Sequence, residues 1–198
     1  MKSIATTHLI LTLALAFVVP TTFGISSRVS KKVLGGKNMP IAAEQLPVLA
    51  SDRPITLNKE STRVTLQAVD RNGQTLAARL QNLPHGHRLY LVLKDLSVKE
   101  QPGTLFRIYL DLPEEVKPEP NDLRFVGRFN FYSAGQSVGL RPPQTGGSFF
   151  FSFDITAVAQ KLLAQRLLDD QTTLTILATG IPRSNSDPKI GRIEIIEQ

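Results

Sequence analysis

Apolar and polar residues alternate through residues 88–114, RLYLVLKDLSVKEQPGTLFRIYLDLPE. The apolar rows are Leu89, Leu91 and Leu93 in a first extended segment and Phe106, Ile108, Leu110 and Leu112 in a second one. Successive side chains of a β-strand point to opposite sides, so the pattern predicts two strands that each bury one apolar row. Gln101-Pro102-Gly103 between them is typical of a turn, because Pro fixes φ and Gly permits a positive φ.

Several further segments alternate in the same way and predict additional short strands. They cover residues 62–68, 124–132, 148–154, 172–178 and 190–197. Residues 157–168, AVAQKLLAQRLL, have helical spacing after Thr156, which can cap a helix, whereas residues 75–83 fit either a short helix or a strand. The prediction is therefore an all-β protein, an antiparallel β-sandwich of about seven strands, jelly-roll or Ig-like, with one short α-helix across one end.

The N-terminal residues are typical of a targeting segment. Lys2 precedes an apolar run, Leu9–Val19, which has the length of a signal-peptide core and is too short to span a bilayer. We expect a signal peptide over residues 1–24, a flexible linker over 25–54 and a folded domain over 55–198. The alternative is an uncleaved membrane anchor. Cleavage would give an exported protein, periplasmic or extracellular, without stable membrane insertion.

Composition excludes several kinds of chemistry. The chain has 198 residues, a formal charge of +6 and no cysteine, which rules out disulfides, thiolate metal sites and cysteine nucleophiles. Basic residues follow the signal segment at Arg28, Lys31, Lys32 and Lys37. A basic tail can bind nucleic acid, but export argues against such a partner, so we interpret this segment as a solvated linker.

Candidates for a metal site or for catalysis are few. Of three histidines, His8 lies in the signal segment, and His85 and His87 flank Gly86 in a predicted turn. This pair is a weak metal candidate, because metals require further ligands. We predict no nucleophile elbow, because the one Gly-x-Ser-x-Gly match, at residues 135–139, lies in a Gly- and Pro-rich loop and not at a turn from a strand into a helix. We predict no catalytic residue, no metal site and no cofactor.

Acidic residues have simpler interpretations than catalysis. Asp111, Glu114, Glu115 and Glu119 form an acidic cluster, whose glutamates lie in a proline-rich loop and are expected to be solvated, and Asp154 is expected to cap the helix that follows it. Four aromatic residues fall opposite the predicted core rows, at Tyr90, Tyr109, Tyr132 and Phe150. They form core if both sheet faces are covered and otherwise a patch for a ligand or partner. We expect Phe150 in the core and leave Tyr132 open.

The order of several motifs resembles a known family. These motifs are PGTLFRIYLDLPE at 102–114, RFVGRFNFY at 124–132, FSFDIT at 151–156, TTLTILATG at 172–180 and PKIGRIEI at 188–195. Together they resemble the C-terminal β-sandwich domain that follows the copper domain in tyrosinases and polyphenol oxidases, over about residues 46–197. The Lys-Phe-Asp-Val motif of the plant enzymes is not matched, since residues 106–110 read FRIYL.

The resemblance implies an accessory function. Tyrosinase-type dicopper centres use six histidines, so this chain does not supply one, and no enzyme activity is expected of it. In the family this domain packs on the copper domain and shields its site. The resemblance thus implies a non-catalytic, exported accessory domain that binds a copper-containing phenol oxidase or a similar protein. The alternative is an independent secreted binding module for a polysaccharide or an envelope component.

The long loop Ser133–Gly147, rich in Gly and Pro, is the expected contact element. Loops of this length in compact domains are more often functional or disordered than neutral. We therefore predict partner contacts at Tyr132, Leu140 and Arg141, from the length of this loop and the aromatic residue beside it.

Overall fold

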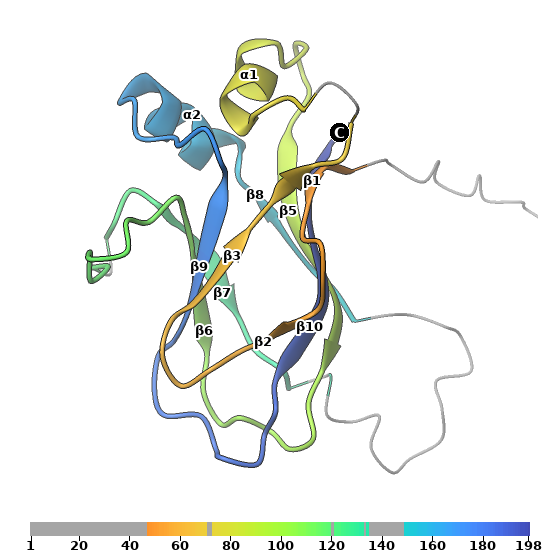
Figure 1. The fold of residues 1–198 in the computed structure, drawn as a ribbon, viewed down its shortest axis with the longest axis vertical. Coiled ribbons are helices and arrows are strands. Elements are labelled where there is room, and N and C mark those ends of the chain that lie inside the picture. The colour runs from red at the N-terminus through yellow and green to blue at the C-terminus, as the bar shows by residue number, and fades with distance from the viewer. Residues whose placement is uncertain (1–46, 71–72, 120, 133, 135–148) are drawn as a thin grey trace, which may run out of the picture. The chain divides into compact units, whose positions relative to one another are not determined.

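The protein folds as two antiparallel β-sheets in the part of the chain that the structure, a computed structural model, describes: residues 47–70, 73–119, 121–132, 134 and 149–198. This part contains ten β-strands and two α-helices (Figure 1). The predicted all-β sandwich is confirmed, with more strands and one more helix than the sequence indicated.

A six-stranded sheet is built around the longest strand pair. Its strands are β1 (Pro47–Ala50), β2 (Ile55–Thr56), β4 (Gln67–Ala68), β5 (Leu89–Ser97), β8 (Phe151–Asp154) and β10 (Lys189–Glu197). The order is β4-β1-β10-β5-β8, and β2 also pairs with β10. β5 and β10 pair over their whole length, from Lys189 opposite Ser97 to Glu197 opposite Leu89.

A four-stranded sheet forms the other layer. It contains β3 (Thr62–Thr65), β6 (Phe106–Leu110), β7 (Phe125–Phe129) and β9 (Thr173–Ala178), in the order β3-β9-β6-β7. Apolar residues from both sheets meet in one core, among them Leu91, Leu93 and Ile195 from the first sheet and Ile108, Leu110 and Ile176 from the second. Burying each such side chain stabilises the fold by about 1.5–3 kcal/mol relative to leaving it exposed.

Two helices cover one end of the sandwich, as Figure 1 shows, and the β5–β6 and β9–β10 connections lie at the opposite end. α1 (Leu76–Gln81) begins after Thr75, whose hydroxyl accepts a hydrogen bond from the Ala78 N–H at 3.2 Å. The segment that fitted either a helix or a strand is thus helical. α2 (Thr156–Ala164) is the predicted helix, and Ala159 and Leu162 bury its inner face in the core.

Both ends of α2 are fixed by local hydrogen bonds. α2 begins after Ile155, whose side chain makes no cap bond, and the predicted cap Thr156 is the first helical residue; the Asp154 carboxylate, one residue before Ile155, accepts a bond from the Thr156 N–H at 3.0 Å and so satisfies one free N–H of the first turn. At the other end Arg166 has φ +57°, and the Leu167 N–H bonds to the Leu162 carbonyl at 2.8 Å. This left-handed residue ends the helix before the predicted limit at residue 168.

The expected strand pairs needed correction. β5 and β6 do not pair with each other, because the connection between them carries the chain from the six-stranded to the four-stranded sheet. Residues 62–68, predicted as one strand, are divided between β3 in one sheet and β4 in the other. Alternation reports which face of a strand is buried and does not report which strand lies beside it.

The folded part begins earlier than predicted. β1, within the predicted linker 25–54, pairs with β10 and with β4 and buries Leu49 in the core. The boundary at residue 55 was therefore placed too late. The predicted signal peptide and the first part of the linker lie outside the described residues. None of the described helices is long and apolar enough to cross a membrane.

Candidate functional site

Tyr132 lies at the wall of an open pocket at the end of the sandwich opposite the helices. Of the predicted contact residues it is the one that the structure describes, and its side chain is 69% exposed. Leu140 and Arg141 lie outside the described residues. The pocket has a volume of about 600 Å³ and is formed by Gln101 and Gly103–Leu105 before β6, by Asn130–Tyr132 after β7, and by Thr179 and Gly180 after β9. We call it the Tyr132 pocket.

Strand geometry brings these three segments together. β6 lies between β7 and β9 in the four-stranded sheet and is antiparallel to both. The start of β6 and the ends of its two neighbours therefore lie at the same end of the sheet. The Thr179 N–H donates to the Leu105 carbonyl at 2.8 Å, and the hydroxyls of Thr104 and Thr179 are 3.3 Å apart. Two walls of the pocket are therefore hydrogen-bonded directly to each other.

Gln101 fixes the third wall. Its side-chain amide donates to the carbonyl of Phe131 at 3.0 Å and to that of Tyr132 at 3.1 Å. The Tyr132 N–H in turn donates to the Asn130 side-chain oxygen at 3.0 Å. The backbone of Tyr132 is thus held on both sides while its ring remains in solvent. An aromatic ring with a fixed backbone offers contact area at a low entropic cost.

Phe131 connects the pocket to the core. Its ring is 1% exposed and packs edge-on against Phe106 and at a tilt against Phe129, with ring centroids 5.5 and 5.7 Å apart. β7 ends at Phe129, and in the turn that follows Phe131 faces the core while Tyr132 faces solvent. The exposure of Tyr132 therefore follows from the packing of its neighbour.

Two further exposed apolar residues lie at the pocket wall or next to it in sequence, and the sequence analysis missed both. Leu105 is 41% exposed at the pocket wall, and Ile181, which directly follows Gly180, is 86% exposed. Ile181 could have been predicted from the sequence, because it is a large aliphatic residue in a loop that otherwise consists of polar residues, prolines and a glycine. Exposed apolar side chains grouped around a pocket are typical of a contact surface for a protein or ligand.

The other aromatic residues divide between core and surface. Tyr109 is fully buried and Tyr90 is half-buried. Phe150, expected in the core, is 65% exposed, and its neighbour Phe149 is 40% exposed. The expectation for Phe150 was wrong because β8 begins only at Phe151, so the regular alternation does not extend back to residues 149 and 150.

The two candidate metal ligands occupy an exposed turn. Gly86 has φ +88°, the His87 N–H bonds to the Pro84 carbonyl at 3.0 Å, and both histidine side chains are exposed. The His87 ring nitrogen Nδ1 lies 2.9 Å from a Glu197 carboxylate oxygen. Among the described residues, no group of three or more His, Cys, Asp or Glu side chains is placed to hold a metal ion.

Asp111 differs from the other residues of the predicted acidic group. Glu114, Glu115 and Glu119 are exposed, whereas Asp111 is 2% exposed, and burial raises its pKa to about 6. Its carboxylate accepts bonds from the Thr173 N–H at 2.6 Å and the Asp169 N–H at 3.3 Å. Asp111 is thus buried, unlike the three glutamates, and its contacts give it a structural role between β6 and β9.

Comparison with known proteins gives a family and similar folds. The family described as "Domain of unknown function (DUF7868)" matches residues 45–198. No curated protein matches the chain. Among solved structures, it is similar to latent aurone synthase, a polyphenol oxidase from its natural source, with 17% identity and a TM-score of 0.44 over 73% of this chain and 25% of that one.

Latent apple tyrosinase is similar at 16% identity and a TM-score of 0.43, over 73% of this chain and 27% of that one. The chain thus spans about a quarter of the length of the solved structures that it matches. Both are named as enzymes of the group that the sequence motifs resemble. At such low identity the likeness concerns the fold alone. Through the match over residues 45–198, the chain belongs to the family described as "Domain of unknown function (DUF7868)".

Proposed function

We propose that this protein is a non-catalytic accessory domain that docks on a copper-containing phenol oxidase and covers the entrance to its copper site. The observation that carries the proposal is the Tyr132 pocket with its exposed apolar rim of Leu105, Tyr132 and Ile181. The order of sequence motifs, which resembles the C-terminal domain of tyrosinases and polyphenol oxidases, supports the choice of partner.

The chemistry of the chain supports an accessory function. A tyrosinase-type dicopper centre requires six histidines, and the whole chain contains three. The two that lie in the described part are exposed in one turn, and His87 already contacts Glu197. Phenol oxidation would therefore be a property of the partner, and this chain would supply contact area only.

The form of the rim suits protein recognition. Hot spots of protein interfaces are enriched in Tyr and are often surrounded by residues that exclude water. Tyr132 is held by Gln101 at its backbone, while Leu105 supplies aliphatic surface at the pocket wall and Ile181 supplies it next to the lining residue Gly180. Docking would bury these three side chains and so remove apolar surface from water. Export, proposed from the apolar run Leu9–Val19, would place the domain outside the cytoplasm.

The proposal is tested with a copper phenol oxidase from the same host that lacks a C-terminal domain of its own. Purified protein is immobilised, the oxidase is passed over it, and the dissociation constant is measured together with the copper content of the bound fraction. We expect saturable binding of the copper-loaded oxidase. Absence of binding at oxidase concentrations up to 100 µM, a range well above that of specific complexes, would overturn the proposal.

A further inference from the structure

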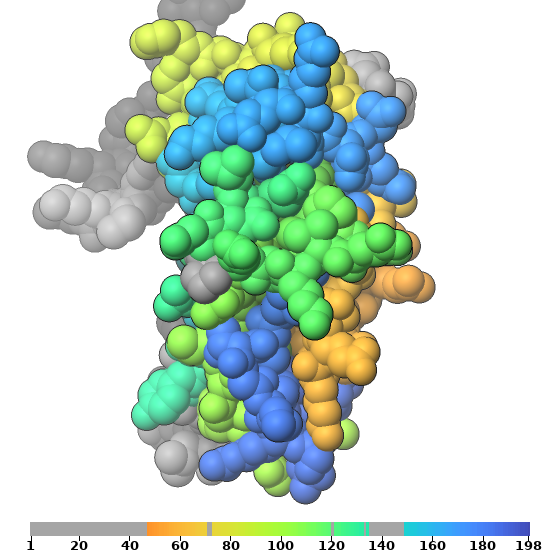
Figure 2. Space-filling model, turned by 90° about the vertical axis from the view of Figure 1, so that its left-hand side faces the viewer, coloured from red at the N-terminus to blue at the C-terminus, as the bar shows by residue number. Residues whose placement is uncertain are grey.

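A second pocket lies at the same end of the sandwich and has a different chemical character. Its volume is about 610 Å³, and it is formed by residues 56–59 at the end of β2 and directly after it, by Lys99, and by the β9–β10 loop from residue 182 to residue 188. The polar side chains used below are Asn58, Lys59, Lys99, Arg183, Ser184 and Asn185. Figure 2 shows the segment after β2 (orange) beside the β9–β10 loop (blue). We call it the basic pocket.

Positive charge predominates in the basic pocket. Its lining contains three cations, Lys59, Lys99 and Arg183, and a single carboxylate, Asp187. That carboxylate is already paired, with Lys99 at 3.2 Å and Lys189 at 3.0 Å, and hydrogen bonds from Lys189 and Lys99 lower its pKa. Asp187 therefore stays ionised and does not compete for the remaining cations.

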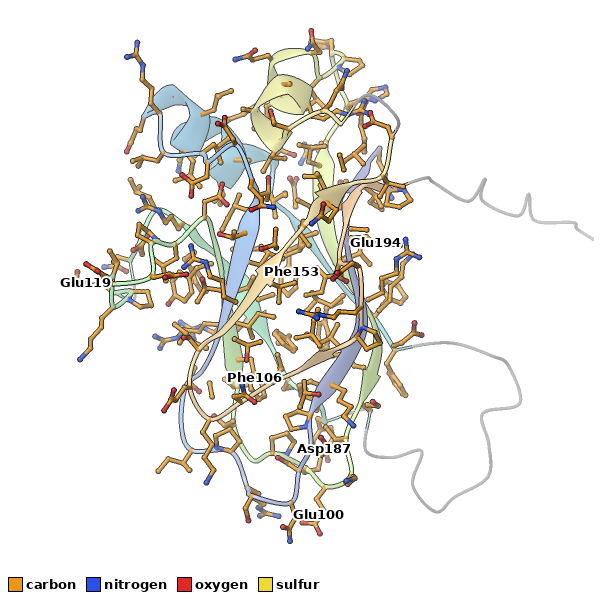
Figure 3. All side chains as sticks on the ribbon, in the orientation of Figure 1. Glu100, Phe106, Glu119, Phe153, Asp187 and Glu194 are labelled. Carbon is orange, nitrogen blue, oxygen red and sulfur yellow. The ribbon has the colours of Figure 1, made fainter. Side chains whose placement is uncertain are left out.

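Two cations remain available to a ligand. Lys59 and Arg183 have no ion-pair partner within the described part of the chain, and both are exposed. Glu60 and Glu100 are adjacent in sequence but do not line the pocket. Figure 3 shows Glu100 beyond Asp187, toward the tip of the sandwich. The unpaired charge of the pocket is thus positive, which favours an anionic group.

Backbone hydrogen bonds hold the pocket in shape. The Leu57 N–H donates to the Pro188 carbonyl and the Lys99 N–H to the Ser186 carbonyl, both at 2.9 Å. The Arg183 N–H donates to the Pro102 carbonyl at 3.1 Å, and the Ser186 hydroxyl donates to the Arg183 carbonyl at 2.6 Å. The loop that carries Arg183 is therefore attached to both other walls, so the cations are presented by a fixed frame.

We propose that the basic pocket binds an acidic saccharide, with a carboxylate, sulfate or phosphate group against Lys59 and Arg183 and hydroxyls against Asn58, Ser184 and Asn185. A guanidinium group pairs with planar oxyanions in a bidentate way. Hydroxyl and amide side chains both donate and accept hydrogen bonds, as sugar hydroxyls do. The volume accommodates an organic ligand, since small-molecule pockets span about 300–1,000 Å³. This activity is separate from docking at the Tyr132 pocket.

The probe for this site is the trimer of galacturonic acid, titrated into the protein at low ionic strength, with the neutral galactose trimer and inorganic phosphate as comparisons. We expect saturable binding of the acidic trimer. The neutral trimer should bind with a dissociation constant above about 1 mM or not detectably. The binding curve of the acidic trimer should shift with salt concentration. The double variant Lys59→Gln, Arg183→Gln should bind the acidic trimer at least tenfold more weakly. Neither side chain has an ion pair in the described part, so folding should be preserved.

The matched control is the double variant Lys161→Gln, Arg166→Gln, on and just after α2 at the helical end of the sandwich (Figure 1), which removes the same two positive charges elsewhere. It should bind the acidic trimer like the unmodified protein. Equal losses in the Lys161→Gln, Arg166→Gln control and in the Lys59→Gln, Arg183→Gln variant would contradict the proposal, because binding would then follow net charge alone. Binding of inorganic phosphate as tight as that of the trimer would also overturn it, since the site would hold an adventitious ion only.

Discussion

Two hydrogen bonds join Asp111 to Thr173 where the end of β6 lies beside the start of β9. The Asp111 N–H donates to the Thr173 carbonyl at 2.8 Å, and the Asp111 carboxylate accepts from the Thr173 N–H at 2.6 Å. Asp111 itself has φ +47°, outside the region that most residues adopt. A buried carboxylate thus holds the end of the four-stranded sheet to the segment that follows α2.

The first prediction is a pH dependence of stability that comes from Asp111. Its pKa in the folded protein is about 6, raised by burial above the value of 3.8 that applies to an exposed side chain. The folded state therefore binds the proton more tightly, so the free energy of unfolding should decrease as pH rises from about 4 to about 6. The expected contribution is about 3 kcal/mol, from 1.36 kcal/mol for each pKa unit.

The measurement compares urea unfolding of the unmodified protein and of Asp111→Asn at several pH values between 4 and 7. Asn does not titrate, so the difference between the two proteins isolates this group. We expect the advantage of the unmodified protein over the variant to be largest near pH 4 and to decrease toward pH 7. A difference that stays constant over this range would show that Asp111 has an ordinary pKa.

The second prediction concerns Gly127 on β7. A Cβ atom at this position would lie 2.6 Å from two carbons of the Phe153 ring, which packs across from β8. Gly127→Ala should therefore force the ring or the strand to move and should cost about 1–3 kcal/mol of unfolding free energy. Thermal unfolding of the single variant measures this cost.

Phe153→Leu provides the control for this contact. In the Phe153→Leu background the ring is absent, so adding Gly127→Ala should cost clearly less than it does in the unmodified protein. Equal costs in the two backgrounds would mean that the Phe153 ring is not what excludes a side chain at residue 127.

The third prediction concerns the end of α2. Arg166 has φ +57°, a conformation that glycine adopts without strain. Arg166→Gly should increase the free energy of unfolding by about 0.5–1 kcal/mol, the range expected when backbone strain is relieved. Arg166→Ala is the control, because it removes the side chain and keeps the strain; it should leave stability nearly unchanged. A glycine variant less stable than the alanine variant would contradict this account.

The sequence predicted the layers of the fold better than their connections. Alternation identified the buried rows of β5 and β6 correctly, since Leu89, Leu91, Phe106 and Ile108 are all at most 1% exposed. It did not show that the two strands belong to different sheets, because neighbours in a sheet are chosen by contacts between residues far apart in the chain. Pairing β10 with β5, for example, joins residues near the C-terminus to the middle of the chain.

The candidate site was predictable in part. Tyr132 was selected because it borders a long loop, and the structure places it at a pocket wall with an exposed ring. Ile181 and the fixing role of Gln101 were missed, since both depend on where separate connections meet in space. The buried state of Asp111 was missed for the same reason: its burial comes from contacts with Thr173 and Asp169, which are distant in sequence.

The most direct test of the docking proposal measures catechol oxidation by the copper phenol oxidase during titration with three forms of this protein. These are the unmodified protein, the double variant Tyr132→Ala, Ile181→Ser, and the control Leu123→Ser, whose side chain is 45% exposed but does not line the Tyr132 pocket. We expect the unmodified protein and the control to inhibit the oxidase with the same concentration dependence, and the double variant to require at least tenfold more protein. Equal inhibition by all three forms, or inhibition by none, would contradict docking through the Tyr132 pocket.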